Sequence, residues 1–301
     1  MAVLEVAAHA KINLSLDVLR KREDGYHDLR MIMQTVELHD TVRLEAVSGG
    51  ISLECNNRRV PQDGTNIAWK AADLLMSGQG IKSGVRITII KRIPVAAGLA
   101  GGSADAAAVL RGLNDLFMIG LESDDLRRLG KQVGADVPFC IDGGTRLAEG
   151  IGERLTALED FSGVDIILVK PEMDVSTAWV YAKLKISEIA DCDRPDINLV
   201  VQALAKQDIK TVAGNMKNVL EEVTIPKFGI IREAKERLIE FGALGSIMSG
   251  SGPTVFGIFS DSATAATAYR RLTADSRWKC FYTRTTAKVS FFDWHSCALQ
   301  K

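Results

Sequence analysis

The sequence predicts an α+β protein of two domains, and three stretches of the chain carry this prediction. Apolar and polar residues alternate over positions 8–18, as in a half-buried strand. A second strand pattern, at 85–93, leads through a glycine-rich loop into a helix pattern. After residue 163, short apolar strands and amphipathic helices follow again, so runs of strands and then helices occur twice.

The elements of the first half follow from periodicity and from turn residues. The strand at 8–18 places Lys11 and Asn13 on its polar face, and Asp24-Gly25 marks the turn after it. Thr65 or Asn66 caps a predicted helix. The further predicted elements are strands at 29–38, 42–45, 51–54, 85–93 and 146–149, helices at 65–76, 106–117 and 123–132, and a small-residue turn at 134–138.

The second half repeats the mixture. No linker stands out by composition, and we place the domain boundary near residue 160, giving domains of residues 1–160 and 161–301. The predicted strands are 164–169, 244–248, 254–259 and 278–285, and the predicted helices are 176–184, 198–204, 215–223, 226–241 and 263–274.

Composition narrows the function classes. A net charge of −1 and 25% charged residues give no basic surface for nucleic acid. No apolar run approaches the roughly 20 residues of a membrane span, and the N-terminus lacks a signal segment, so we expect no membrane contact and a cytoplasmic protein. The four histidines lack metal-ligand spacing, and reduced thiols are expected at the five scattered cysteines: Cys55, Cys140, Cys192, Cys280 and Cys297.

The most informative segment is P-V-A-A-G-L-A-G-G-S-A-D-A-A, residues 94–107. Its glycines let backbone N–H groups approach an anion, and the start of the next helix adds unpaired N–H groups and a positive dipole end. A phosphate cradle is one interpretation. An ordinary glycine-rich turn with Ser103 as the N-cap is the other. The segment fits neither the Walker A pattern nor G-x-G-x-x-G.

Four further features each have a structural alternative when taken alone. Lys11 fits a solvated charge, and Asp136 fits a helix cap or an Asx-turn. The S-G-S-G-P segment at 249–253 fits a hairpin, and Tyr26 fits an aromatic ring packed on the core.

The order of these features along the chain favours a shared function over the structural alternatives. A-K-I-N-L, P-x-x-x-G-L-x-G-G-S-A, G-A-D-V-P and S-G-S-G-P together resemble the GHMP kinase superfamily, from about residue 5 to about residue 290. The R-E-D-G-Y-H segment at 22–27 is similar to the superfamily's kinases of 4-diphosphocytidyl-2-C-methyl-D-erythritol. The resemblance implies an N-terminal ribosomal-protein-S5-domain-2-like domain and a C-terminal ferredoxin-like α/β domain.

The resemblance also implies an activity: ATP-dependent phosphorylation of the substrate's 2-hydroxyl in the non-mevalonate route to isoprenoid precursors. Asp136 then corresponds to the general base and Lys11 to its charged neighbour. The substrate is a small molecule that carries cytidine diphosphate, and the residues expected to bind it are Asn13, Tyr26, His27 and Tyr181.

The glycine-rich segment then corresponds to the ATP phosphate loop, with Mg²⁺ as the accompanying cation and Ser103 within its reach. Alanines stand at 96, 97 and 100, where the family often has glycine, and we expect them to keep negative φ. The 249–253 loop is expected to back this loop. The residues expected to bind ATP are Pro94, Val95, Ala96, Ala97, Gly98, Leu99, Ala100, Gly101, Gly102, Ser103 and Ala104.

Two other functions stay open. One is a different small-alcohol kinase of the superfamily, of the mevalonate or homoserine type, although those substrates carry no base for Tyr26 and His27. The other is a non-catalytic nucleotide-binding protein. The sequence assigns no acidic metal ligand and is compatible with a monomer or a homodimer.

Overall fold

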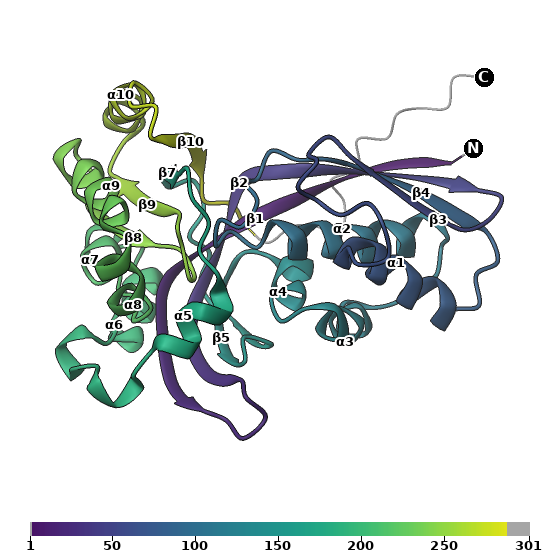
Figure 1. Ribbon diagram of the computed structural model, residues 1–301, viewed down its shortest axis with the longest axis horizontal. Coiled ribbons are helices and arrows are strands. Elements are labelled where there is room, and N and C mark those ends of the chain that lie inside the picture. Colours follow the sequence, from purple (N-terminus) through teal and green to yellow (C-terminus); the bar gives the residue numbers. More distant parts are fainter. Residues whose placement is uncertain (1, 288–301) are drawn as a thin grey trace.

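Two β-sheets, each covered by helices, make up residues 2–287, the part of the chain that the structure, a computed structural model, describes (Figure 1). This arrangement confirms the predicted two-domain α+β fold. The first sheet ends at Ala157 and the second begins at Asp165. A boundary near residue 160 therefore remains our proposal for the division of the chain.

The N-terminal sheet is built around one long hairpin. Strand β2 pairs along one edge with β1, and along its other edge with β4 and β5. The two strands predicted at 29–38 and 42–45 are one continuous strand, because the polar residues between them do not interrupt its pairing with β1. Strand β6 was not predicted. The strands are β1 (Val3–Lys21), β2 (His27–Val47), β3 (Ile51–Cys55), β4 (Gly84–Ile90), β5 (Thr145–Gly150) and β6 (Arg154–Ala157).

Helices α1, α2 and α4 pack on one face of this sheet, with α2 on β1 and β2, and α3 packs on these helices (Figure 1). Asn66, not Thr65, caps the first helix by accepting from the N–H of Ala68. The 134–138 turn leads directly into a short helix that was not predicted. The helices are α1 (Ile67–Gly78), α2 (Gly101–Leu116), α3 (Ser123–Val133) and α4 (Val137–Asp142).

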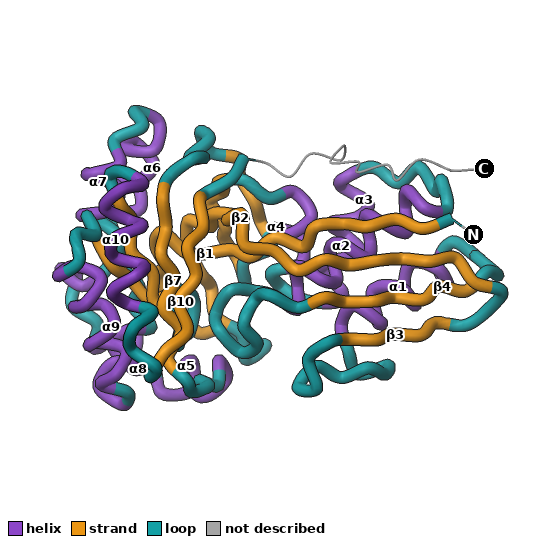
Figure 2. Tube along the Cα trace, turned by 90° about the horizontal axis from the view of Figure 1, so that it is seen from above, coloured by secondary structure: helices purple, strands orange, loops and turns teal. Residues whose placement is uncertain are grey.

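The C-terminal sheet is antiparallel, in the order β10-β7-β9-β8, with α9 and α10 packed on it (Figure 2). The helix predicted at 215–223 begins only at Glu221, and α7 was not predicted. The elements are β7 (Asp165–Pro171), α5 (Thr177–Lys183), α6 (Ile197–Ala205), α7 (Ile209–Gly214), α8 (Glu221–Lys227), α9 (Gly229–Glu240), β8 (Gly245–Met248), β9 (Val255–Phe259), α10 (Ser262–Leu272) and β10 (Trp278–Arg284).

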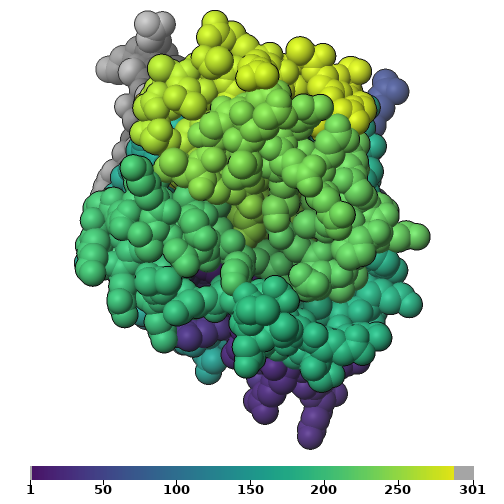
Figure 3. All heavy atoms as spheres, turned by 90° about the vertical axis from the view of Figure 1, so that its left-hand side faces the viewer, coloured from purple at the N-terminus to yellow at the C-terminus, as the bar shows by residue number. Residues whose placement is uncertain are grey.

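The long hairpin also joins the two sheets. The N–H of Leu16 in β1 donates to the carbonyl of Lys217 at 2.9 Å, and the N–H of Val219 donates back to Leu16 at 3.1 Å. The N–H of Leu38 in β2 donates to Oγ1 of Thr283 in β10 at 2.9 Å. In Figure 3 the C-terminal half forms the face toward the viewer, and the purple part of the hairpin projects beneath it.

Within residues 2–287, none of the helices combines the length and apolar character that a membrane span requires. The thiols of Cys55, Cys140, Cys192 and Cys280 are free, as expected. Cys297 lies outside the described residues.

Candidate active site

Strand β1 contributes a buried lysine and a buried asparagine that share one face of the strand. Lys11 is 5% exposed, and its Nζ donates to Oδ1 of Asn13 at 2.8 Å. A lysine with only a solvation role would stand in water. The alternative of a solvated charge is therefore wrong, and the ammonium has a defined direction.

The carboxylate of Asp136 forms an ion pair with this ammonium. Its Oδ2 lies 3.7 Å from Nζ of Lys11, and its side chain is 32% exposed. Asp136 occupies the N-cap position of α4, but its carboxylate accepts no capping hydrogen bond. Asp136 thus stands where a helix cap would stand but does not act as one. Its carboxylate oxygens remain available to a ligand.

In the loop between β4 and α2, the backbone angle φ alternates between positive and negative values. Residue φ is +54° at Ala96, +74° at Gly98 and +56° at Ala100, whereas Ala97 and Leu99 between them keep negative φ. Alternating hand turns successive N–H groups toward the same concave side, and such a concavity binds anions. The alternating φ values thus favour the interpretation as a phosphate cradle over that of a simple turn.

The expectation of negative φ is correct for Ala97 and wrong for Ala96 and Ala100. The left-handed region costs an alanine roughly 1–2 kcal/mol, and surrounding contacts can impose it. Contacts on both sides hold the loop: the N–H of Lys11 donates to the carbonyl of Leu99 at 3.2 Å, and Ser249 binds the carbonyl of Gly98.

Helix α2 begins at Gly101, five residues before the predicted start, so Gly101, Gly102 and Ser103 form its first turn. The N-cap is Ala100 and not Ser103, and no side chain caps this helix end. Uncapped N–H groups at the first turn of a long helix are available to an anion. The helix start therefore adds potential N–H donors directly after the alternating loop.

The S-G-S-G-P loop lies directly behind the phosphate loop, as expected. Oγ of Ser249 donates to the carbonyl of Gly98 at 2.9 Å. A Cβ on Gly98 would stand 2.2 Å from the carbonyl oxygen of Ser249, so only glycine fits there. Ser251 in turn shares a 2.8 Å hydrogen bond with Oγ1 of Thr177, a contact between residues far apart in sequence that no local motif signals.

The predicted base-binding residues come together only in part. The ring centroids of His27 and Tyr181 lie 5.0 Å apart at 35°. Tyr26 is 60% exposed, so the alternative of a ring packed on the core is wrong. Burial, with the positive charge of Lys21 adding to it, lowers the pKa of His27, which favours a neutral ring with one donor and one acceptor nitrogen.

Tyr181 connects this aromatic group with the Lys11–Asp136 pair. Burial raises the pKa of its hydroxyl, and the negative charge of Asp136 raises it further. The phenol oxygen and the carboxylate therefore lie within electrostatic range of each other. The structure thus brings Lys11, Asn13, Asp136, Tyr181 and His27 to one region beside the phosphate loop.

No cluster of three or more His, Cys, Asp or Glu side chains suited to a metal ion occurs in the 2–287 segment. This is compatible with Mg²⁺ bound mainly through nucleotide phosphates, which needs only one or two protein ligands. The hydroxyl of Ser103, which we expect within reach of Mg²⁺, stands in the first turn of α2. It lies 3.9 Å from the place where a Cβ of Gly134 would stand, two residues before Asp136.

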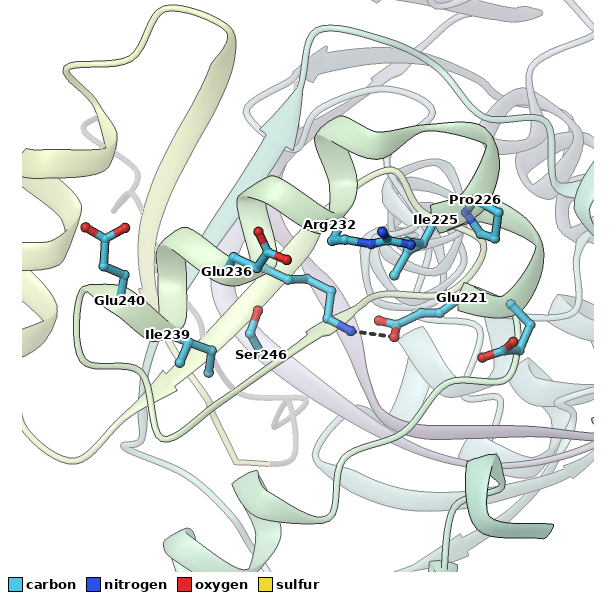
Figure 4. Close-up of a pocket in the computed structure, with 10 residues that line it drawn as sticks. Glu221, Ile225, Pro226, Arg232, Glu236, Ile239, Glu240 and Ser246 are labelled. Atoms are coloured by element: carbon cyan, nitrogen blue, oxygen red, sulfur yellow. Dashed lines mark hydrogen bonds and ion pairs between the residues drawn. The ribbon is translucent and has the colours of Figure 1, made fainter. Parts of the chain in front are cut away.

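A separate hollow lies on the C-terminal half, between α8, α9 and β8 (Figure 4). Its wall includes the ion pair between Lys235 and Glu221, and none of the predicted site residues lines it. The hollow is therefore distinct from the candidate active site.

Comparison with known proteins first defines the class. Residues 66–144 match the family model described as GHMP kinases N terminal domain, and residues 200–276 match GHMP kinases C terminal. The chain is thus a GHMP kinase, in agreement with its two helix-covered sheets.

Curated relatives then give the family. A 4-diphosphocytidyl-2-C-methyl-D-erythritol kinase of Acetivibrio thermocellus is 56% identical over 285 residues, covering 95% of this chain and 100% of the relative. The kinase of the same name from Clostridium kluyveri is 49% identical, covering 93% and 99%. The chain belongs to the family of 4-diphosphocytidyl-2-C-methyl-D-erythritol kinases.

Solved structures agree. A crystal structure of a 4-(cytidine 5'-diphospho)-2C-methyl-D-erythritol kinase is similar with a TM-score of 0.80 and 33% identity, covering 94% of this chain and 99% of that one. A homoserine kinase from Cytophaga hutchinsonii has a TM-score of 0.75 at 20% identity, covering 96% of each chain, and shares the fold.

Proposed function

We propose that this protein transfers the terminal phosphoryl group of ATP to the 2-hydroxyl of 4-diphosphocytidyl-2-C-methyl-D-erythritol, giving the 2-phosphate and ADP. The reaction belongs to the non-mevalonate synthesis of isoprenoid precursors. Family membership supports the substrate. The observation that carries the chemistry is the 3.7 Å approach of Lys11 Nζ and Asp136 Oδ2 beside the phosphate loop.

Asp136 acts as the general base in this proposal. A sugar hydroxyl is a weak nucleophile, and a carboxylate with free oxygens accepts its proton as the oxygen bonds to phosphorus and the bond to ADP breaks. The Lys11 ammonium stabilises the negative charge that develops on the acceptor oxygen. Asn13 accepts a hydrogen bond from Lys11. It either holds the ammonium in its orientation or binds the substrate hydroxyl itself.

The phosphates of ATP bind along residues 94–104, through backbone N–H groups of the loop after Pro94 and of the first turn of α2. The alternating φ values and the uncapped start of α2 support this assignment, because both expose donors to an anion. Mg²⁺, for which Ser103 is the suggested protein ligand, neutralises phosphate charge when it is bound.

The cytosine base binds between the rings of Tyr26 and Tyr181, with His27 hydrogen-bonding to the base edge. An exposed Tyr26 has room to accept a base on its face. The ring of Tyr181 lies beside the ring of His27, and its hydroxyl feels the charge of Asp136. One substrate can therefore extend from the base site to the acceptor hydroxyl.

A coupled assay of ADP release tests this function. The protein is mixed with ATP, Mg²⁺ and, in separate reactions, 4-diphosphocytidyl-2-C-methyl-D-erythritol, mevalonate or homoserine. We expect turnover only with the cytidine-containing substrate. Turnover confined to mevalonate or homoserine would replace the proposal with that kinase activity, and ATP binding without turnover on any of the three would indicate a non-catalytic nucleotide-binding protein.

Two expectations from the sequence stay predictions. They are the cytoplasmic location and the choice between monomer and homodimer.

A further inference from the structure

A buried ion cluster that the proposed chemistry does not use lies under the phosphate loop. Nζ of Lys91 contacts Oδ2 of Asp40 and lies 2.7 Å from Oδ2 of Asp105. The three side chains are at most 5% exposed. They come from β2, from the link after β4 and from α2, and we name this cluster the clasp.

The clasp holds both ends of the phosphate loop. At the entry, the N–H groups of Arg92 and Ile93 donate to Oδ1 of Asp40, the latter at 2.8 Å. At the exit, Asp105 ties the first turns of α2 to the same lysine. A Cβ on Gly101 would stand 3.1 Å from Nζ of Lys91, so the ammonium lies directly against the first residue of α2.

The electrostatics of the clasp indicate a positioning role more than a stabilising one. Burial would lower the pKa of Lys91, but the carboxylates of Asp105 and Asp40 outweigh that effect and raise it, so the ammonium stays charged. Two acids share one buried cation, and among the described residues Oδ1 of Asp105 is buried without a hydrogen-bond partner. Such a cluster is a poor source of stability compared with apolar packing.

The loop between the two ends needs such a restraint. Ala96 and Ala100 hold left-handed φ, a conformation that persists only where the surroundings impose it. If the first turn of α2 moved away from the end of β4, both residues would be free to relax to negative φ. The alternation that gathers the N–H groups would then be lost.

We propose that Lys91 and Asp105 are positioning residues for ATP, which act by clasping the entry and exit of the phosphate loop and so preserve its array of N–H donors. The inference rests on the proposed assignment of this loop to ATP. It does not depend on the protonation state of Asp105, because either form of the carboxyl leaves an oxygen to accept from Lys91. Burial raises the pKa of Asp105, so both forms are relevant near neutral pH.

The test compares Asp105→Ala with Asp105→Asn. Alanine removes the tie to α2 but leaves Lys91 and Asp40 as a balanced pair, and asparagine restores an acceptor for Lys91. Asp165→Ala is the matched control. This carboxylate is also buried and accepts from Tyr282, Arg284 and Ser262, but it starts β7 in the other sheet.

We expect Asp105→Ala to raise the KM and the dissociation constant for ATP about tenfold, because misplaced donors lose their hydrogen bonds to phosphate. The KM for the cytidine substrate should stay within about twofold of wild type. Asp105→Asn should recover most of the ATP affinity, and Asp165→Ala should leave both KM values unchanged. If the alanine variant does not fold, Asp105→Ser, whose hydroxyl falls short of Lys91, replaces it with the same expectations.

Three results would overturn the inference: unchanged ATP affinity in Asp105→Ala, an equal rise in both KM values, or an equal loss in the alanine and asparagine variants. Isothermal titration with a non-hydrolysable ATP analogue measures the nucleotide affinity without turnover. The inference can therefore be judged even if the wild-type protein does not phosphorylate the expected substrate, a result that would count against the proposed function alone.

Discussion

At the scale of single residues, the account depends on Asp136 and Lys11. The two side chains come from different elements and approach each other, and the carboxylate does not cap its helix. A carboxylate that only stabilised α4 would be expected to accept from the N–H groups of its first turn. Asp136 instead has Oδ2 3.7 Å from the Lys11 ammonium, which is the arrangement that our proposal of a general base requires.

Asp136→Asn tests this role. The amide keeps the shape of the side chain but does not take up the proton, so kcat should fall by roughly 10²–10⁴-fold. The dissociation constants for ATP and for the cytidine substrate should change little, as titration calorimetry would show. A variant that retained most of its kcat would remove Asp136 from the chemistry.

Tyr26 provides the second test at this scale. If its exposed ring stacks on the cytosine, Tyr26→Ala should weaken substrate binding by about 1–3 kcal/mol. The affinity for ATP should not change, which serves as the internal control. Tyr26→Phe should bind as the wild type does, because stacking needs the ring and not the hydroxyl. Unaltered substrate affinity in the alanine variant would exclude the ring from the site.

The residues of the pair could be predicted from sequence because each lies in a short local motif. Lys11 and Asn13 follow strand alternation, and Asp136 follows G-A-D-V-P. The clasp could not be predicted. Asp40 and Lys91 lie 51 positions apart, and nothing in the local sequence separates either from a surface charge.

At the scale of elements, the phosphate loop shows where propensity fails. Negative φ is the general preference of alanine, and at Ala96 and Ala100 tertiary contacts override it. The start of α2 was misplaced for a related reason. Two glycines and a serine have low helix propensity, but at the first turn their N–H groups need no partner within the helix.

Ala96→Gly tests the strain directly, since Ala96 is exposed and loses little burial. Relief of roughly 1–2 kcal/mol of left-handed strain exceeds the roughly 0.4–1 kcal/mol lost through a more flexible unfolded chain. The free energy of unfolding from urea titration should therefore rise slightly or stay the same.

Ala97→Gly is the matched control one position on. Ala97 keeps a negative φ and is buried, so glycine there should destabilise the protein by about 0.5–1 kcal/mol. Equal losses of stability in the two variants would contradict the assignment of a left-handed φ to Ala96.

At the scale of the whole molecule, the long hairpin makes the two sheets interdependent. Its strands carry the N-terminal sheet and also hydrogen-bond to residues 217, 219 and 283 of the C-terminal half. The α+β class and most strands followed from local periodicity. The length of this hairpin did not, because pairing between distant segments decides whether polar positions such as 39–41 interrupt a strand.

This architecture predicts a single unfolding transition. Calorimetry should give one peak, with a calorimetric enthalpy close to the van't Hoff enthalpy. A non-hydrolysable ATP analogue at about 100 times its dissociation constant should add about 2.7 kcal/mol of stability. The whole peak should therefore move to a higher temperature. Two separate peaks, with only one responding to nucleotide, would show that the halves unfold independently.

The central claim is that the ammonium of Lys11 and the carboxylate of Asp136 converge on the acceptor hydroxyl. A crystal structure with a non-hydrolysable ATP analogue and 4-diphosphocytidyl-2-C-methyl-D-erythritol measures this directly. We predict that the 2-hydroxyl lies about 2.6–3.2 Å from a carboxylate oxygen of Asp136, and in line with the terminal phosphorus held by residues 94–104. A 2-hydroxyl bound out of reach of Asp136, with the terminal phosphate away from that loop, would contradict the account.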